Sequence, residues 1–231
     1  MQTFVALVLL WFSHWTSTLH GVPVTQIIPQ ENFDLGKFMG VWYEVAVTST
    51  CPLYMQRRRG SSAGAAMEMR PSESAANINV TSSTFRSNSC QERSTQYHLT
   101  DTPGRFLYHV PRLSFCFPYA AQIKISAGHN VTSVCHSIDD DITLSAGLSA
   151  DVELNVVQTN YDEFAMMVLL STERPTGTRT TILKLYGRTA NMTSGMVSEF
   201  TSLVQRHGIN PDSIVTTEPK GCKVSSLNGA P

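Results

Sequence analysis

The chain has 231 residues, of which 42% are hydrophobic and 15% are charged, and its formal net charge is −1. This length and composition suit a single domain with a sizeable core. The near-neutral balance excludes the strongly basic surface that nucleic-acid-binding proteins use, and no block of like charges indicates a charged tail.

An apolar run, residues 4–12, lies near the start of the chain. It is too short to cross a bilayer, and it is typical of the hydrophobic part of a secretory signal peptide cleaved near His20 or Gly21. Because no Lys or Arg precedes the run, a buried N-terminal strand is the alternative. We expect residues 1–20 to be a leader, and the mature protein to be secreted, extracellular and without a membrane span.

The chain then alternates short extended segments with turn signals, which predicts antiparallel strands joined by hairpins. Strands are expected at residues 40–47, 77–86, 90–99, 105–109, 154–161, 164–170, 180–186 and 211–217. Residues 54–70 are rich in Arg, Gly, Ser and Ala, and they predict either an irregular strand or a loop. Since no βαβ pattern is present, the expected fold class is all-β, an antiparallel barrel.

The hydrophobic period changes at residues 194–207, where apolar side chains recur every three or four positions. These side chains are Met196, Val197, Phe200, Leu203 and Val204. The spacing predicts one amphipathic helix. Thr193 or Ser194 can cap its start, and Gly208 can end it.

Three short motifs resemble the marks of the lipocalin family: Gly40-Val41-Trp42, the turn Thr159-Asn160-Tyr161, and Arg188 after the strand at 180–186. A guanidinium stacks well on an indole face and can donate to open carbonyls at a closed barrel end. The resemblance therefore implies structural roles for Gly40, Trp42 and Arg188. It also implies an eight-stranded antiparallel up-and-down barrel over residues 21–223, with one C-terminal α-helix packed outside and a flexible tail at 224–231.

Several longer segments, including residues 101–109, 159–164 and 208–214, resemble the alpha-1-microglobulin branch of that family. Residues 110–144 have no counterpart there, and they stand where a short hairpin should join two strands. The block is either a genuine loop insertion or a retained intron. Its length favours the intron, because hairpin loops usually have about two to five residues.

The five cysteines are Cys51, Cys90, Cys116, Cys135 and Cys222. An odd number leaves at least one thiol unpaired or bonded to another molecule. The resemblance implies a structural disulfide between Cys90 and Cys222, and a reactive thiol at Cys51 on the rim of the open barrel end. The three arginines at 57–59 would lower the pKa of that thiol. The alternative is a disulfide from Cys51 to Cys116 or Cys135.

The resemblance further implies lysines beside the thiol, and Lys184 matches one of them. Leu99 stands at the position of another, which weakens the case for thiol activation. Cys51 and Lys184 are thus the candidate catalytic residues of a thiol-dependent reductase or isomerase. Haem is an implied ligand, although no cofactor is required. His98 and His109 do not stand in metal-ligand spacing, so no metal site is predicted.

The first functional hypothesis is a binding protein for small hydrophobic ligands, including haem, with radical scavenging by the rim thiol. The residues expected to line the barrel are Trp42, Val45, Phe106, Val156, Met166 and Leu183. The alternatives are the Cys51-dependent enzyme and covalent attachment to other plasma proteins through Cys51. Glycosylation is expected at the sequons of Asn79, Asn130 and Asn191.

Overall fold

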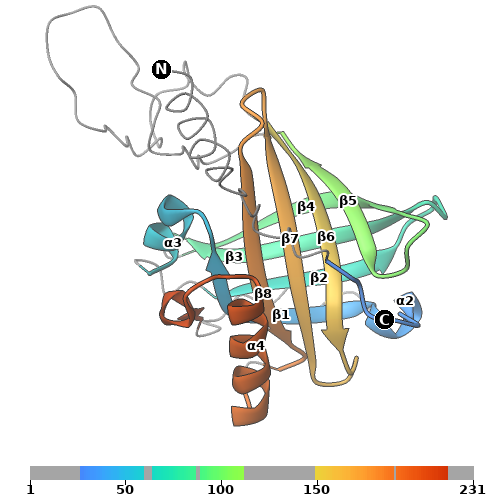
Figure 1. Cartoon of the computed structure of the whole chain (residues 1–231). Helices are drawn as coiled ribbons and strands as arrows, with labels where there is room; N and C mark the ends of the chain where they lie inside the picture. Colours follow the sequence, from blue (N-terminus) through green and yellow to red (C-terminus); the bar gives the residue numbers. More distant parts are fainter. Residues whose placement is uncertain (1–26, 60–63, 87–88, 112–148, 190, 218–231) are drawn as a thin grey trace, which may run out of the picture.

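The structure, a computed structural model, describes residues 27–59, 64–86, 89–111, 149–189 and 191–217. Eight antiparallel strands form a closed barrel, as the sequence predicts (Figure 1). The strands are β1 Gly40–Ser49, β2 Ala65–Pro71, β3 Asn77–Arg86, β4 Ser89–Leu99, β5 Arg105–Val110, β6 Ser149–Thr159, β7 Phe164–Arg174 and β8 Arg179–Gly187.

The barrel closes through β1, which pairs with β8 along one edge and with β2 along the other. A short ninth strand, β9 (Val215–Thr216), continues the second edge beyond the end of β2. Pairing is uneven around the barrel. Strands β3 and β4 are paired at ten positions, whereas β4 and β5 are paired at two, His98 with Leu107 and Leu99 with Phe106.

The described part of the chain has three α-helices beside the strands. Helix α2 (Leu35–Phe38) precedes β1, and α3 (Pro52–Arg59) follows it at the opposite end of the barrel (Figure 1). Helix α4 (Ser194–Arg206) begins at Thr193, whose side chain accepts a hydrogen bond from the Met196 N–H. The capping and the helix match the sequence prediction. Among the described helices, none combines the length and apolar character needed to cross a membrane.

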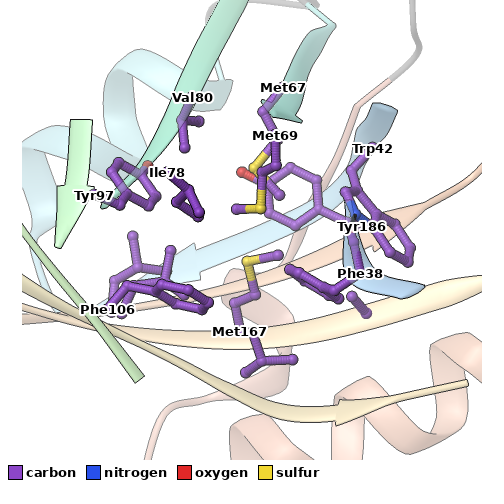
Figure 2. Close-up of a cluster of buried hydrophobic side chains, with 14 of the residues drawn as sticks. Phe38, Trp42, Met67, Met69, Ile78, Val80, Tyr97, Phe106, Met167 and Tyr186 are labelled. Carbon is purple, nitrogen blue, oxygen red and sulfur yellow. Dashed lines mark hydrogen bonds between the residues drawn. The ribbon is translucent and has the colours of Figure 1, made fainter. Parts of the chain in front are cut away.

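Two apolar clusters hold these elements together. One lies inside the barrel and is built by side chains from most of the strands (Figure 2). The other lies outside, where α4 packs Met196, Phe200, Leu203 and Val204 against strands β1, β7 and β8. These three strands are therefore buried on both faces, which explains their nearly continuous hydrophobic sequences.

Trp42 plugs one end of the barrel. Its ring is fully buried against Phe38 of α2, with centroids 5.1 Å apart, and its indole N–H donates to the Phe38 carbonyl at 2.9 Å. The guanidinium carbon of Arg188 lies 3.7 Å from the Trp42 ring centroid. Gly40 has φ +96, and a Cβ there would lie 3.3 Å from the Arg188 Nη1. The G-x-W motif thus needs its glycine for backbone conformation and for space.

Arg188 also fastens three segments of this closed end. It donates to the backbone carbonyls of Tyr161 at 2.8 Å, Val41 at 3.0 Å and Lys37 at 2.9 Å. In the turn before β7, the Asn160 side chain accepts hydrogen bonds from the N–H groups of Glu163 and Phe164, both at 3.0 Å. The amide oxygen of Asn160 thereby does what a carboxylate would do at the same position.

The sequence missed helix α3. The sequence predicts an irregular strand or a loop over residues 54–70; β2 agrees with the strand, whereas α3 was not predicted. The final segment is also mixed: a 3₁₀ turn at Pro211–Ser213 precedes β9. The expected leader (1–20), most of the unmatched block (110–144) and the expected tail (224–231) lie outside the described residues, so these interpretations stay predictions.

Candidate functional site

A cavity of about 190 Å³ lies inside the barrel. Part of its wall is apolar, with Met67 from β2, Leu154 from β6 and Leu169 from β7. Its other walls are aromatic and polar, and they include Tyr97, Tyr108, Tyr186, Lys184 and, at an exposed position, Arg93. An apolar chamber with a few converging polar groups is the usual form of a small-molecule site.

Two of the tyrosines that line the cavity stack on each other. The rings of Tyr97 on β4 and Tyr108 on β5 are stacked, with centroids 4.2 Å apart and an interplanar angle of 12°. Burial raises the pKa of the Tyr97 hydroxyl well above its ordinary value, and it also raises that of Tyr108. Both phenols are therefore neutral at physiological pH and can donate hydrogen bonds. Figure 2 shows Tyr97 and Tyr186 in the interior cluster.

Beside the cavity lies a buried ion cluster, defined here as Glu44, Lys184 and Arg58. The Glu44 carboxylate on β1 accepts from the Lys184 ammonium on β8 at 2.8 Å, and it is also paired with the Arg58 guanidinium on α3. The Lys184 Nζ lies 3.4 Å from the Tyr186 hydroxyl. The exposed fractions are 1% for the Glu44 side chain, 14% for Arg58 and 20% for Lys184.

The opposite charges in this cluster favour the charged forms of Glu44 and Lys184. Burial alone would raise the pKa of the Glu44 carboxyl, but the charges of Lys184 and Arg58 outweigh it and lower that pKa. Burial alone would lower the pKa of the Lys184 ammonium, whereas the adjacent Glu44 carboxylate raises it well above its ordinary value. The Glu44 carboxyl and the Lys184 amine are therefore both charged at neutral pH.

The structure places the predicted lining residues on two different sides of the sheet. Trp42, Phe106 and Val156 belong to the interior cluster. Val45, Met166 and Leu183 belong to the outer cluster beneath α4, so the prediction that these three face the lumen is wrong. The error has a physical cause: both faces of β1, β7 and β8 are buried, and hydrophobic alternation cannot distinguish them.

Cys51 is not the exposed thiol that the sequence suggested. It is 3% exposed, and it forms a disulfide. The prediction of a reactive rim thiol is therefore wrong in this structure, and the alternative in which Cys51 is disulfide-bonded agrees with it. An odd cysteine count shows that at least one cysteine has no partner within the chain, but it does not show which one. The partners proposed from the sequence, Cys116 and Cys135, lie outside the described residues.

Cys90 also forms a disulfide. Its predicted partner, Cys222, lies outside the described residues, so that pairing stays a prediction. Asn79 and Asn191 are exposed, as glycosylation requires, and Asn130 lies outside the described residues.

The two histidines on strands make contacts of their own. The Nδ1 of His98 lies 2.7 Å from the Asn77 side-chain oxygen, and that of His109 lies 3.0 Å from the Asp151 carboxylate. In the part of the chain that the structure describes, no group of three or more His, Cys, Asp or Glu side chains could hold a metal ion.

Glu44 and Arg58 are the site residues that sequence reasoning missed. Glu44 follows Trp42 at the spacing of one strand face, so a carboxylate stood on the face that carries the buried indole. That position could have predicted a buried carboxylate, and a buried carboxylate requires a partner of opposite charge. Arg58 gave no such signal, because it lies in the segment whose helix was not predicted.

Comparison with known proteins agrees with the barrel and its motifs. A profile of the lipocalin / cytosolic fatty-acid binding protein family matches residues 39–126 and 128–221. The chain belongs to this family.

Within the family, the chain is similar to Protein AMBP, the alpha-1-microglobulin/bikunin precursor. It is 34% identical to that of Pleuronectes platessa over 224 residues, 96% of this chain, and 31% identical to that of Mesocricetus auratus over 192 residues, 83% of this chain. The chain spans about half the length of these relatives, 52% and 44% respectively. Prostaglandin-H2 D-isomerase of Mus musculus is 23% identical, over 94% of this chain and 97% of that protein.

Proposed function

We propose that this protein binds a small, largely apolar molecule inside the barrel. The observation that carries the proposal is the interior cavity of about 190 Å³, in which apolar side chains from three strands face stacked tyrosines and a lysine. Pockets for drug-sized ligands typically measure about 300–1,000 Å³. The ligand is therefore small, comparable to a short acyl chain or a molecule with one or two rings.

Haem, the ligand that the family resemblance suggested, has weaker support. His109 lies at the cavity, but its side chain is 53% exposed and its Nδ1 contacts Asp151. Cys51 is disulfide-bonded, so its sulfur is not available as a thiolate ligand for iron. Neither His109 nor Cys51 therefore offers a built iron ligand, and we favour a smaller organic molecule.

An enzymatic function through Cys51 is not proposed. The nucleophile in such chemistry is the thiolate, and both described cysteines, Cys51 and Cys90, are in disulfides. The disulfides instead support secretion, because they persist in oxidising compartments. Intact mass spectrometry of the protein from a secreting eukaryotic host tests this part of the proposal: it would show removal of the leader and oxidised cysteines.

Ligand binding is tested by filling the cavity. A neutral environment-sensitive dye such as Nile red is titrated against the folded protein and against Leu169→Trp, which places an indole in the lumen. The control is Leu107→Trp on β5, at a position that is 42% exposed. We expect at least about a tenfold loss of affinity for the lumen variant and no change for the control, since overpacking removes the space for the dye. Equal binding by all three proteins would contradict the proposal.

A further inference from the structure

A row of side chains crosses the outer face of strands β1 to β4. Tyr43 of β1 pairs with Ala66 of β2. Ala66 pairs in turn with Ser83 of β3, and Ser83 pairs with Glu92 of β4. The next residues along β2, β3 and β4 line the interior cavity, so this row points outward, because side chains alternate along a strand. These four residues are called the outer row below.

The middle of the outer row is buried although it lies outside the barrel. Ala66 is 3% exposed and Ser83 is 0% exposed. Helix α4 does not cover them, because the cluster beneath it contains no described residue of β2, β3 or β4. Two such small side chains cannot bury themselves, so another segment of the chain must cover them.

The Ser83 hydroxyl has a further requirement. Its oxygen is buried, and it has no hydrogen-bond partner among the described residues. Native proteins leave few buried polar groups unsatisfied, and each such group calls for an explanation. A backbone carbonyl of the covering segment would satisfy this hydroxyl, since a serine O–H donates one hydrogen bond.

The C-terminal segment leaves the described structure close to this row. Thr217 donates its N–H to the Val45 carbonyl of β1 at 3.1 Å. Three strand spacings, about 14 Å, separate β1 from β4 in the sheet. The residues from Thr217 to Cys222 can span about 17 Å when extended. Cys222 can therefore reach β4, where Cys90 is disulfide-bonded.

The charges of the segment and the row are complementary. Glu92 follows Cys90 by two residues, so both side chains point to the outer face, about 7 Å apart. Lys223 directly follows Cys222. A disulfide between the two cysteines would bring the Lys223 ammonium close to the Glu92 carboxylate, at the β4 end of the outer row.

We propose that residues 218–223 dock in an extended conformation across the outer row. Lys223 pairs with Glu92, and the Gly221 carbonyl accepts the hydrogen bond of the Ser83 hydroxyl. Glycine suits this place, because it has no Cβ to hold the backbone away from the row. The outer row is then a docking surface for the chain's own C-terminal segment, and it acts independently of any ligand in the barrel.

The test is hydrogen–deuterium exchange of the oxidised, full-length protein, followed by mass spectrometry. The exchange rate of residues 218–223 is expressed relative to that of β7 in the same protein, which removes any effect on global stability. Glu92→Lys and Lys223→Glu should each speed this exchange about threefold, the size that one surface ion pair provides. The double variant restores the pair with its charges exchanged, and its rate should return to within about twofold of wild type.

Two matched controls accompany the test. Glu73→Lys reverses an exposed charge between β2 and β3 and should leave the exchange unchanged. Ser83→Leu fills the middle of the outer row and should speed the exchange, whereas Thr81→Leu, in the next row of the same strand face, should not.

Two outcomes would overturn the proposal. If Glu92→Lys, Lys223→Glu and Ser83→Leu all exchange like wild type, the segment is held by its disulfide alone. Protection of residues 218–223 that rises with protein concentration would mean that the segment docks on a second copy of the chain.

Discussion

The closed end and the middle of the barrel both hold a cation against aromatic rings, but its hydrogen bonds differ between the two places. At the closed end, Arg188 lies on Trp42 and donates to three backbone carbonyls. In the middle, Lys184 and Arg58 share one carboxylate, and one Arg58 donor has no partner among the described residues. The closed end is thus held by hydrogen bonds to the backbone, whereas the ion cluster depends on the charge of one carboxylate.

The largest expected effect is at the closed end. Trp42→Ala removes a fully buried indole and the surface on which Arg188 stacks. We expect a loss of about 3–5 kcal/mol in the free energy of unfolding, as for other buried aromatic truncations. Urea denaturation followed by circular dichroism measures it. Leu107→Ala, at an exposed position on β5, is the control and should cost much less. Similar losses for both would show that Trp42 is not the anchor described here.

The next effect distinguishes the members of the ion cluster. Glu44→Gln leaves two buried cations without their carboxylate and should cost about 3 kcal/mol in unfolding free energy. Lys184→Met should cost less, because Glu44 keeps Arg58 and the methionine packs against apolar neighbours. Urea midpoints of the two variants give the comparison. A larger loss for Lys184→Met would contradict this order.

Lowering the pH should reproduce part of the stability loss expected for Glu44→Gln. The pKa of Glu44 in the folded protein lies below its ordinary value of 4.5, because Lys184 and Arg58 outweigh the cost of burial. The stabilisation from its charge is therefore fully present above pH 4.5 and is lost as the pH falls through the lower, folded-state pKa. Wild type should lose stability over this range more steeply than Glu44→Gln. Parallel pH profiles of the two urea midpoints would contradict the assignment.

The smallest expected effect is in helix α4, outside both the closed end and the ion cluster, and it serves as a reference for the other variants. Thr193→Ala removes the side chain that caps α4 through the Met196 N–H. It should cost about 1 kcal/mol in unfolding free energy, measured by urea denaturation. Binding of the dye should not change, because α4 packs outside the barrel. Altered dye binding in this variant would show that the outer helix influences the lumen.

The sequence predicted the barrel fold better than the side-chain contacts inside the barrel, and particular residues show why. Trp42, Arg188 and Asn160 act through local motifs and backbone conformations that a short pattern can identify. The contact between Arg188 and Trp42 follows the family resemblance closely. The ion cluster, in contrast, joins residues 44, 58 and 184, and only the folded chain brings them together. The Cys51 prediction failed because an odd cysteine count does not identify the unpaired thiol.

The sparse pairing of β4 with β5 gives the barrel a seam. A closed cylinder of strands separates first where the fewest backbone hydrogen bonds cross, and here two residue pairs join the strands. The two strands of this seam carry Tyr97 on β4 and Tyr108 on β5, and both rings line the cavity. Amide protons of β5 should therefore exchange with deuterium sooner than those of β7. Brief parting of this seam would give a guest a sideways entrance that leaves Trp42 and the closed end undisturbed.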